Sequence, residues 1–227
     1  MKTVIFILSM ISVLFLSGVS QSADILEQLK NNEDWKVIKD DAETQFRRKP
    51  LRGFDLYALE ISREVKVSPG QVFAVLLDVA SYPEVLADND LLEAEEVERD
   101  PEQIIGYQFA RLPLVSNRHY LFSFDLTAYE QSLKAGAMNL HWTLLEPDGK
   151  YSGFIKAKEE LNNNPIYIAN GAGLWMIREV EDGVYENVYR LYLDPAGWMP
   201  GWLVNSFNQK NLEQLFNRVL AAAEKRS

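Results

Sequence analysis

Two histidines have the most versatile chemistry in this 227-residue chain, because an imidazole can act as a general acid or base or can bind a metal ion. His119 and His141 are the only histidines, and the sequence contains no cysteine. Together they could form a catalytic dyad or a metal-binding pair. Both occupy positions that strand alternation assigns to solvent. We therefore expect no metal site and no catalytic role for them.

Charged residues could also do chemistry. The acidic run at 88–96 lacks the glycine and the ligand spacing of a calcium loop, so it predicts a solvated acidic face. A second group could pair within a sheet or act as acid–base groups of an enzyme, and it comprises Arg118, Arg178, Glu179, Glu186 and Arg190. Ion pairing is the simpler interpretation. No glycine-rich phosphate loop or nucleophile elbow is present. We predict no catalytic residue, no cofactor, and a protein that is not an enzyme.

The overall composition narrows the class of protein further. Lys and Arg number 23 against 33 Asp and Glu, a formal net charge of −10. Nucleic-acid binders use Lys and Arg to displace counterions from phosphates, so we expect no nucleic-acid partner. The lack of cysteine excludes disulfides, thiolate metal sites and iron–sulfur clusters. What remains is an acidic protein of ordinary globular composition.

The first 22 residues have the pattern of a secretory signal peptide. Lys2 is the only charge before Asp24, and an apolar run over residues 4–16 is shorter than the roughly 20 residues that span a bilayer. Ser20 and Ser22 fit the small-residue positions of a cleavage site. We predict a signal peptide over 1–22, a single domain over 23–227, and a periplasmic or secreted location. The alternative is an uncleaved anchor or a buried N-terminal helix.

The rest of the chain is typical of an α+β domain. Residues 24–31 have helical spacing, 35–38 and 54–67 look extended, and Ser68-Pro69 begins a helix. Turn sequences divide 91–194 into short runs, and Asp148-Gly149 and Asp182-Gly183 each predict a β-hairpin. A helix over about 200–224 would be roughly 35 Å long. These elements predict an antiparallel sheet crossed by a long C-terminal helix.

One face of the predicted sheet is aromatic. The strand at 118–127 alternates, with Arg118, Tyr120, Phe122, Phe124 and Leu126 on the buried face and His119, Leu121, Ser123, Asp125 and Thr127 toward solvent. Neighbouring strands add the apolar residues Ile105, Tyr107, Phe109, Met138, Leu140, Trp142 and Leu144. Such a face either packs on the helix or lines a space for an apolar ligand, and the pattern alone does not separate these. The phenol and indole groups favour a lined cavity.

Several segments resemble one known family. They are residues 72–78 in the helix, Ile105-Gly106-Tyr107, the proline-containing loop 112–118, Gly173-Leu174-Trp175, and Asp194-x-x-Gly197-Trp198-x-Pro200. Together they resemble the START (steroidogenic-acute-regulatory-related lipid-transfer) family over about 35–222. The resemblance implies a helix-grip fold, in which a curved antiparallel β-sheet wraps around a long C-terminal α-helix and encloses a hydrophobic tunnel. His119 stands where the family usually has aspartate, and Phe124 stands where sterol-binding members carry arginine, so the ligand class stays open.

We predict a cavity lining and a gate. The expected ligand-binding residues are Tyr107, Phe109, Tyr120, Phe122, Phe124, Leu140, Trp142, Trp175, Arg190, Tyr192, Val204 and Phe207. Parity over 184–194 does not determine whether Arg190 and Tyr192 or Tyr189 and Leu191 point inward. The expected gate residues are Arg111, Pro113, Val115, Trp198, Met199 and Trp202. Tryptophan and methionine beside Pro and Gly suit a lipid interface, although packing on the sheet edge is the alternative.

These observations predict an exported, monomeric protein that binds a hydrophobic ligand, which we expect to be a lipid, and transfers it between membranes through transient membrane contact. The alternatives are a polyketide-cyclase-like or hydrolase enzyme with the same cavity, and an interaction module whose groove receives a partner protein. An empty void destabilises a protein by roughly 24 cal/mol per Å³. We therefore expect the tunnel to be occupied or partly collapsed.

Overall fold

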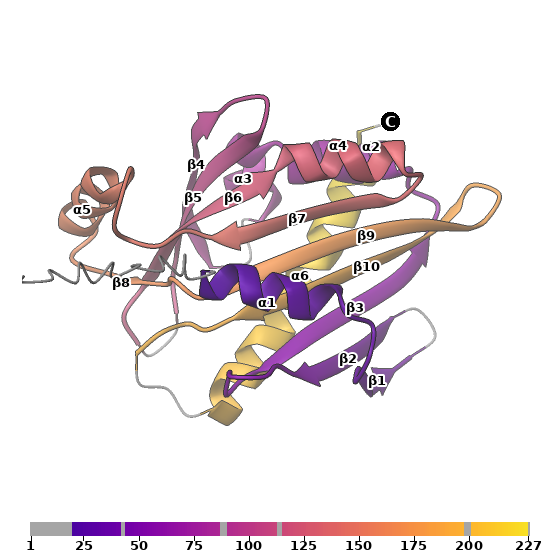
Figure 1. Cartoon of the computed structure of the whole chain (residues 1–227), viewed down its shortest axis with the longest axis horizontal. Helices are drawn as coiled ribbons and strands as arrows, with labels where there is room; N and C mark the ends of the chain where they lie inside the picture. The colour runs from indigo at the N-terminus through magenta and orange to yellow at the C-terminus, as the bar shows by residue number, and fades with distance from the viewer. Residues whose placement is uncertain (1–19, 42–43, 87–89, 113–114, 198–200, 227) are drawn as a thin grey trace, which may run out of the picture.

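A curved antiparallel sheet forms the centre of the molecule (Figure 1). The structure is a computed structural model that describes residues 20–41, 44–86, 90–112, 115–197 and 201–226. The strands are β1 (Lys36–Asp40), β2 (Gln45–Pro50), β3 (Tyr57–Val65), β4 (Leu91–Arg99), β5 (Gln103–Ala110), β6 (Arg118–Asp125), β7 (Met138–Leu144), β8 (Ile166–Tyr167), β9 (Gly171–Glu181) and β10 (Val184–Leu193). Their order is β1-β2-β3-β10-β9-β7-β6-β5-β4, with the short β8 parallel to β6.

Helices cover both faces of this sheet. They are α1 (Gln21–Lys30), α2 (Pro69–Leu76), the 3₁₀ turn η1 (Val79–Ser81), α3 (Tyr82–Val85), α4 (Leu126–Lys134), α5 (Ser152–Leu161) and α6 (Gly201–Glu224). Helix α6 crosses one face of the sheet and α1 lies on the other (Figure 1). We call the α6 side the inner face and the α1 side the outer face. In the described part of the chain, no helix has the length and apolarity needed to cross a bilayer.

Three buried clusters hold these layers together. The largest joins the inner face of the sheet to α2 and α6, and Phe216 of α6 stacks on Trp175 of β9 with centroids 5.1 Å apart. The second lies between α1 and the outer face of β3, β9 and β10. The third lies between α5 and the outer face of β5 and β6. The predicted α+β helix-grip class is therefore confirmed, with α6 beginning and ending close to the expected bounds.

Local chemistry explains two of the predicted boundaries. The Ser68 hydroxyl accepts a hydrogen bond from the Gln71 amide at 3.4 Å, and the Gln71 side chain accepts one from the Ser68 amide at 3.0 Å. This capping box, with Pro69 in the first turn, begins α2 as expected. The Asp182-Gly183 hairpin is confirmed as well, because Gly183 has φ +72° and β9 pairs with β10 around it.

The second predicted hairpin, at Asp148-Gly149, was wrong. Gly149 makes a turn with φ +107°, but α5 (Ser152–Leu161) follows it rather than a strand. Lys158 lies four residues after Phe154 and three after Ile155, and Ile155 is buried beneath the helix. That spacing belongs to an amphipathic helix, which can cover the sheet where a strand could not.

The N-terminal predictions stay predictions, because residues 1–19 lie outside the described part. Helix α1 begins at Gln21, and the Ser20 hydroxyl accepts from the Ala23 amide at 3.2 Å. Ser22 is buried and donates to the Ala169 carbonyl at 3.1 Å. Cleavage after Ser22 would remove both contacts, so N-terminal sequencing of the protein purified from its host would show whether and where it is cut.

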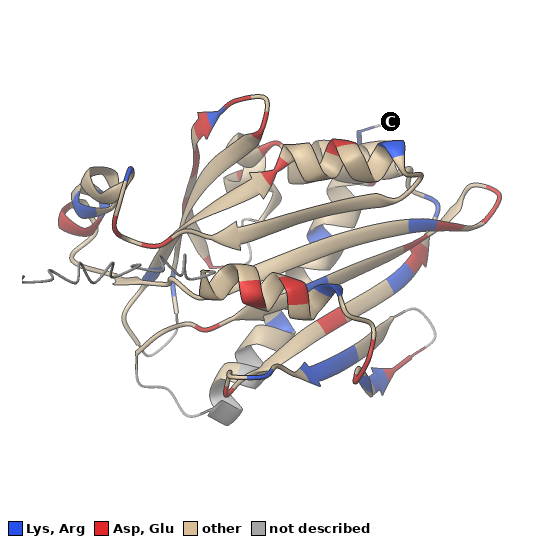
Figure 2. Ribbon diagram, in the orientation of Figure 1, with Lys and Arg blue, Asp and Glu red and all other residues tan. Residues whose placement is uncertain are grey.

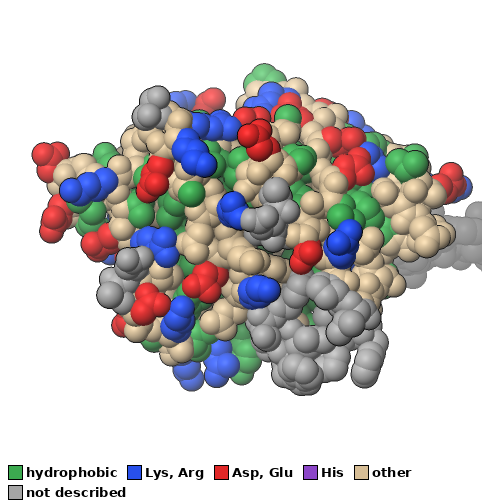
Figure 3. Space-filling model, turned by 180° about the vertical axis from the view of Figure 1, so that it is seen from behind, with side chains coloured by type: hydrophobic (Ala, Val, Ile, Leu, Met, Phe, Trp, Pro, Cys, Tyr) green, Lys and Arg blue, Asp and Glu red, His purple; other side chains and the backbone are tan. Residues whose placement is uncertain are grey.

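The net negative charge is spread over the surface. Figure 2 shows charged residues on α1, β2 and β3, whereas β7 carries none. On the face seen in Figure 3, acidic and basic side chains are interspersed with hydrophobic ones. This face presents no large patch of a single sign, so the electrostatics that matter for a ligand are those of the interior.

Candidate functional site

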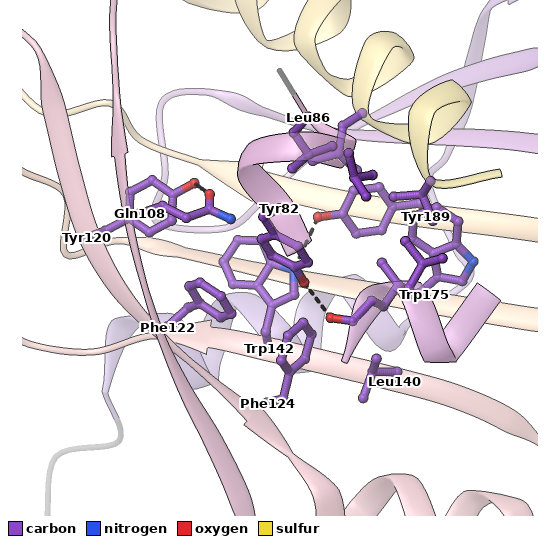
Figure 4. Close-up of a pocket in the computed structure, with 15 residues that line it drawn as sticks. Tyr82, Leu86, Gln108, Tyr120, Phe122, Phe124, Leu140, Trp142, Trp175 and Tyr189 are labelled. Atoms are coloured by element: carbon purple, nitrogen blue, oxygen red, sulfur yellow. Dashed lines mark hydrogen bonds between the residues drawn. The ribbon is translucent and has the colours of Figure 1, made fainter. Parts of the chain in front are cut away.

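An apolar cavity lies between the inner face of the sheet and the helices that cover it (Figure 4). We call it the inner chamber, and its volume is about 80 Å³. Its described lining residues are Val75, Leu76, Tyr82, Val85, Leu86, Gln108, Tyr120, Phe122, Phe124, Leu140, Trp142, Trp175, Tyr189, Leu215 and Val219. None of them is charged. The chamber therefore suits an apolar group.

Strand register decides which residues reach this chamber. In antiparallel pairs, directly opposed residues share one face of the sheet. Tyr120 lies opposite Gln108, and Phe124 lies opposite Trp142. Gln108 is consequently a lining residue that the sequence prediction missed. The sequence shows that Gln108 has the opposite parity from Tyr107 and Phe109, but it does not show which parity faces the cavity.

Two glycines make recesses for the aromatic rings of the chamber. Gly106 lies opposite Phe122, and a Cβ atom at Gly106 would overlap the Phe122 ring. Gly173 lies opposite Trp142, and a Cβ there would be 2.5–2.8 Å from three indole atoms. Since real Cβ contacts are not that close, both rings sit where only glycine permits. The glycines therefore keep these rings against the sheet and out of the chamber.

Three hydrogen bonds link polar side chains of the inner chamber to partners within the protein. Trp142 Nε1 donates to Tyr189 Oη at 3.2 Å, Tyr82 Oη donates to the Leu76 carbonyl at 2.5 Å, and Tyr120 Oη donates to Gln108 Oε1 (Figure 4). Burial raises the pKa of all three tyrosines well above the usual value. They stay neutral at pH 7, so the chamber does not require a polar ligand group to satisfy it.

A second cavity continues from the first. This outer chamber has a volume of about 130 Å³ and shares with the inner one Leu86, Gln108, Tyr120, Trp142, Tyr189 and Leu215. We call these six residues the waist. Beyond the waist the lining gains the polar side chains Arg111, Arg118, Asn208 and Asn211. The cavity is thus apolar at one end and polar at the other.

Arg118 joins two loops beside the outer chamber. Its Nε donates to the Pro195 carbonyl at 2.5 Å, its Nη2 to the Ala196 carbonyl at 3.0 Å, and its Nη1 to the Ser116 carbonyl. The side chain is buried, and burial lowers its pKa from the usual value. One residue therefore ties the segment after β10 to the segment before β6.

The predicted lining residues divide between the two faces of the sheet. Those found at the inner chamber are Tyr120, Phe122, Phe124, Leu140, Trp142 and Trp175. The placement of Tyr107 and Phe109 in the cavity was wrong, because they lie on the outer face of β5, and Tyr107 lies opposite Leu121 there. The prediction assumed that the aromatic residues of neighbouring strands share one face, but the register pairs Tyr107 and Phe109 with residues on the other face of β6.

Arg190 and Tyr192 were listed among the lining residues although the parity of their strand was left open, and both lie on the outer face. Arg190 is buried beneath α1, where its Nε lies 2.6 Å from Glu60 Oε2 and its Nη1 donates to the Leu29 carbonyl at 2.7 Å. Tyr192 packs in the same cluster. The strand instead turns Tyr189 and Leu191 inward. Arg190 thereby helps to anchor α1 through the carbonyls at its C-terminal end.

The remaining predicted positions are less informative. Val204 is buried but lines neither chamber, and Val115 is half-buried and lines neither. Arg111 lines the outer chamber. Pro113, Trp198 and Met199 lie outside the described residues, as do the side chains of Trp202 and Phe207. That any of these residues binds or gates a ligand stays a prediction.

The solvent-side prediction for His119 was wrong. The ring is fully buried beneath β8 and α5, 5.1 Å from the Tyr167 ring, and neither nitrogen has a hydrogen-bond partner. Its Nε2 lies 3.7 Å from Glu159 Oε1, but burial lowers the pKa of His119 to about 4. The ring is therefore neutral at pH 7. His141 is mostly buried, with its Nε2 3.6 Å from Asp125 Oδ2. Within the described residues, no three potential metal ligands come together.

The architecture of this chain is similar to that of several solved structures. No protein-family model and no curated protein sequence matches the chain. The STAR-related lipid transfer protein of Xanthomonas axonopodis (fragment 25–204) is 19% identical, with a TM-score of 0.65 over 85% of this chain and 98% of that one. Human STARD10 is 14% identical, with a TM-score of 0.64 over 90% of this chain and 78% of that one.

An enzyme is among the similar structures. The Zhui aromatase/cyclase from Streptomyces sp. R1128 is 15% identical, with a TM-score of 0.51 over 74% of this chain and 94% of that one. The prediction that the protein is not an enzyme was therefore wrong as an exclusion, because this architecture also serves catalysis. Identities below 20% establish the shared architecture and leave the ligand to the site itself. The chain has the START-like helix-grip fold.

Proposed function

We propose that the protein binds a hydrophobic ligand of the lipid class in its two-chamber cavity and carries it between membranes. The observation that supports this most directly is the inner chamber, whose described lining is uncharged and mostly apolar and whose three tyrosines are hydrogen-bonded within the protein. A chain of about 16 carbons gains on the order of 13 kcal/mol when it leaves water. Since a bilayer offers a similar gain, the protein would act mainly by lowering the aqueous barrier.

The chambers are small for such a ligand. Each is smaller than the roughly 150 Å³ engineered cavity that holds one benzene molecule. A long acyl chain therefore requires the waist to widen. Leu86 and Leu215 are the aliphatic side chains there that could move with α3 and α6. We propose that the empty protein is a partly collapsed state that expands around its ligand.

The setting of this activity is part of the proposal. The N-terminal pattern supports export to the periplasm or beyond, where a hydrophobic molecule needs a carrier between membranes. We propose transient membrane contact through Trp198 and Met199 before α6 and Trp202 in its first turn, because tryptophan and methionine suit a lipid interface.

Mass spectrometry of organic extracts from the purified protein tests this function. Wild-type protein should retain lipid or take it up from vesicles. Leu215→Trp, which fills the waist, should lose this uptake, while Leu133→Trp on the exposed side of α4 should keep it. Lipid-free extracts without uptake from vesicles would contradict the proposal. Turnover of an aromatic polyketide under the same conditions would favour a cyclase.

A further inference from the structure

The outer chamber differs from the rest of this acidic protein in the sign of its charges. The chain has 33 acidic residues against 23 basic ones, yet the described lining of both chambers contains no Asp or Glu. The charged residues it does contain are Arg111 and Arg118. Asp194 lies nearby in sequence, but its carboxylate accepts the Ala196 amide at 3.0 Å within its own turn. The charged side chains that line the polar end of the cavity, among the described residues, are therefore basic.

Hydrogen-bond donors in the outer chamber are only partly used. Asn208 donates to the Leu193 carbonyl at 3.2 Å, and Arg118 donates to three backbone carbonyls. The side chains of Arg111 and Asn211 hydrogen-bond to no other described residue. A guanidinium presents its donors in a fork that fits a carboxylate or a phosphate. Arg111 and Asn211 are thus donors open to a ligand. The Nε2 group of Gln108 at the waist is a third, because within the described residues only the side-chain oxygen of Gln108 is engaged, by Tyr120.

We infer that the ligand is a single-chain anionic amphiphile, held with its tail in the inner chamber and its carboxylate or phosphate head in the outer chamber. This inference rests on the proposed function and specifies its ligand. The linings on either side of the waist set the orientation of the ligand, because the inner chamber is uncharged and its tyrosines Tyr120 and Tyr189 are hydrogen-bonded to neighbouring side chains. An ionised head placed there would lose its hydration without gaining a charged partner. The small volume of the chambers favours one chain over two.

Calorimetric titration with four C12 probes, below their micelle concentrations, tests this inference. The probes are dodecanoate, dodecyl phosphate, dodecanol and dodecyltrimethylammonium. Because hydrogen bonds to charged groups are stronger than those between neutral groups, one or both anions should bind at least about tenfold more tightly than dodecanol. The cation should bind most weakly. The two anions also distinguish a carboxylate head from a phosphate head.

Two substitutions locate the effect. Arg111→Gln should remove most of the preference for the anions over dodecanol. Lys210→Gln removes one positive charge from an exposed position of α6 outside the lining and should preserve the preference. Asn211→Leu should weaken anion binding by a smaller factor. Equal binding of dodecanol and both anions, or a preference unaffected by Arg111→Gln, would overturn the inference while the proposed function stands. Failure of all four probes to bind would count against both.

Discussion

The two faces of β6 are both buried, yet only one encloses a cavity. Tyr120, Phe122 and Phe124 line the inner chamber, whereas His119 and Leu121 pack beneath β8 and α5. Phe122 is 4% exposed and Leu121 is 0% exposed. Burial alone therefore does not mark a ligand site. The difference lies in how completely the covering elements fill the space between themselves and the sheet.

The outer face is filled and the inner face keeps a cavity because different side chains cover them. On the outer face, the short amphipathic α5 brings Phe154 and Ile155 directly onto β5 and β6. On the inner face, Phe122 and Trp142 are drawn against Gly106 and Gly173, which leaves room above them. Close packing is the usual state of an interior, so a retained space needs such a specific cause.

The largest expected effect belongs to the outer face. Glu60→Ala leaves the buried Arg190 without its carboxylate and should lower the free energy of unfolding by about 3–5 kcal/mol. Urea denaturation measures this change, and ligand binding by the folded fraction should be unaltered. The double substitution Glu60→Leu with Arg190→Met should recover much of the loss. If the single variant is as stable as wild type, the pair does not anchor this face.

Adjacent residues of β6 offer a matched test of the comparison. Leu121→Ala should lower stability by about 3 kcal/mol and leave ligand capacity unchanged. Phe122→Ala should be destabilising by a similar amount, but bound ligand should restore part of the loss because the chamber has grown. Thermal unfolding with and without ligand separates the two. The same response in both variants would remove the distinction between the faces.

His119 should make the outer face sensitive to acid. Its pKa is about 4 in the folded protein and 6.5 when unperturbed, so the unfolded chain binds more protons between these values. Stability should therefore decrease by up to about 3 kcal/mol as the pH falls from 6.5 to 4. The pKa of His141 is also lowered, chiefly by burial, and should add to the effect. Urea denaturation at several pH values measures this dependence. The decrease in the free energy of unfolding between pH 6.5 and 4 should become smaller in His119→Phe, and should change less in His141→Phe.

The smallest expected effect on stability comes from the recess at Gly173. Gly173→Ala should displace the Trp142 indole toward the chamber, destabilise the protein by about 1–2 kcal/mol and weaken ligand binding. Gly153→Ala is the control, because a Cβ there meets no atom within 4 Å. Trp fluorescence titration would report both variants. Unchanged ligand affinity in Gly173→Ala would show that the glycine does not shape the chamber.

Local sequence signals predicted most of the fold. The Ser68-Pro69 cap, the Asp182-Gly183 turn and the helical spacing after residue 200 each depend on neighbours in the chain, and the structure contains all three elements. The run after Asp148-Gly149 was misread, because its length fits a strand as well as a helix. The packing of Phe154 and Ile155 onto the outer face of β5 and β6 shows that this run is a helix.

The sequence by itself determined the element order, the aromatic strands and the glycines that make room for them. Tertiary structure alone decided which faces of β5 and β10 meet the cavity, because a shift of one residue in register moves every side chain to the opposite face. It also decided that His119 is buried, since α5 and β8 are distant in the chain from β6. The size of the chambers is likewise a property of the packed whole, because it depends on residues from eight separate elements meeting at one place.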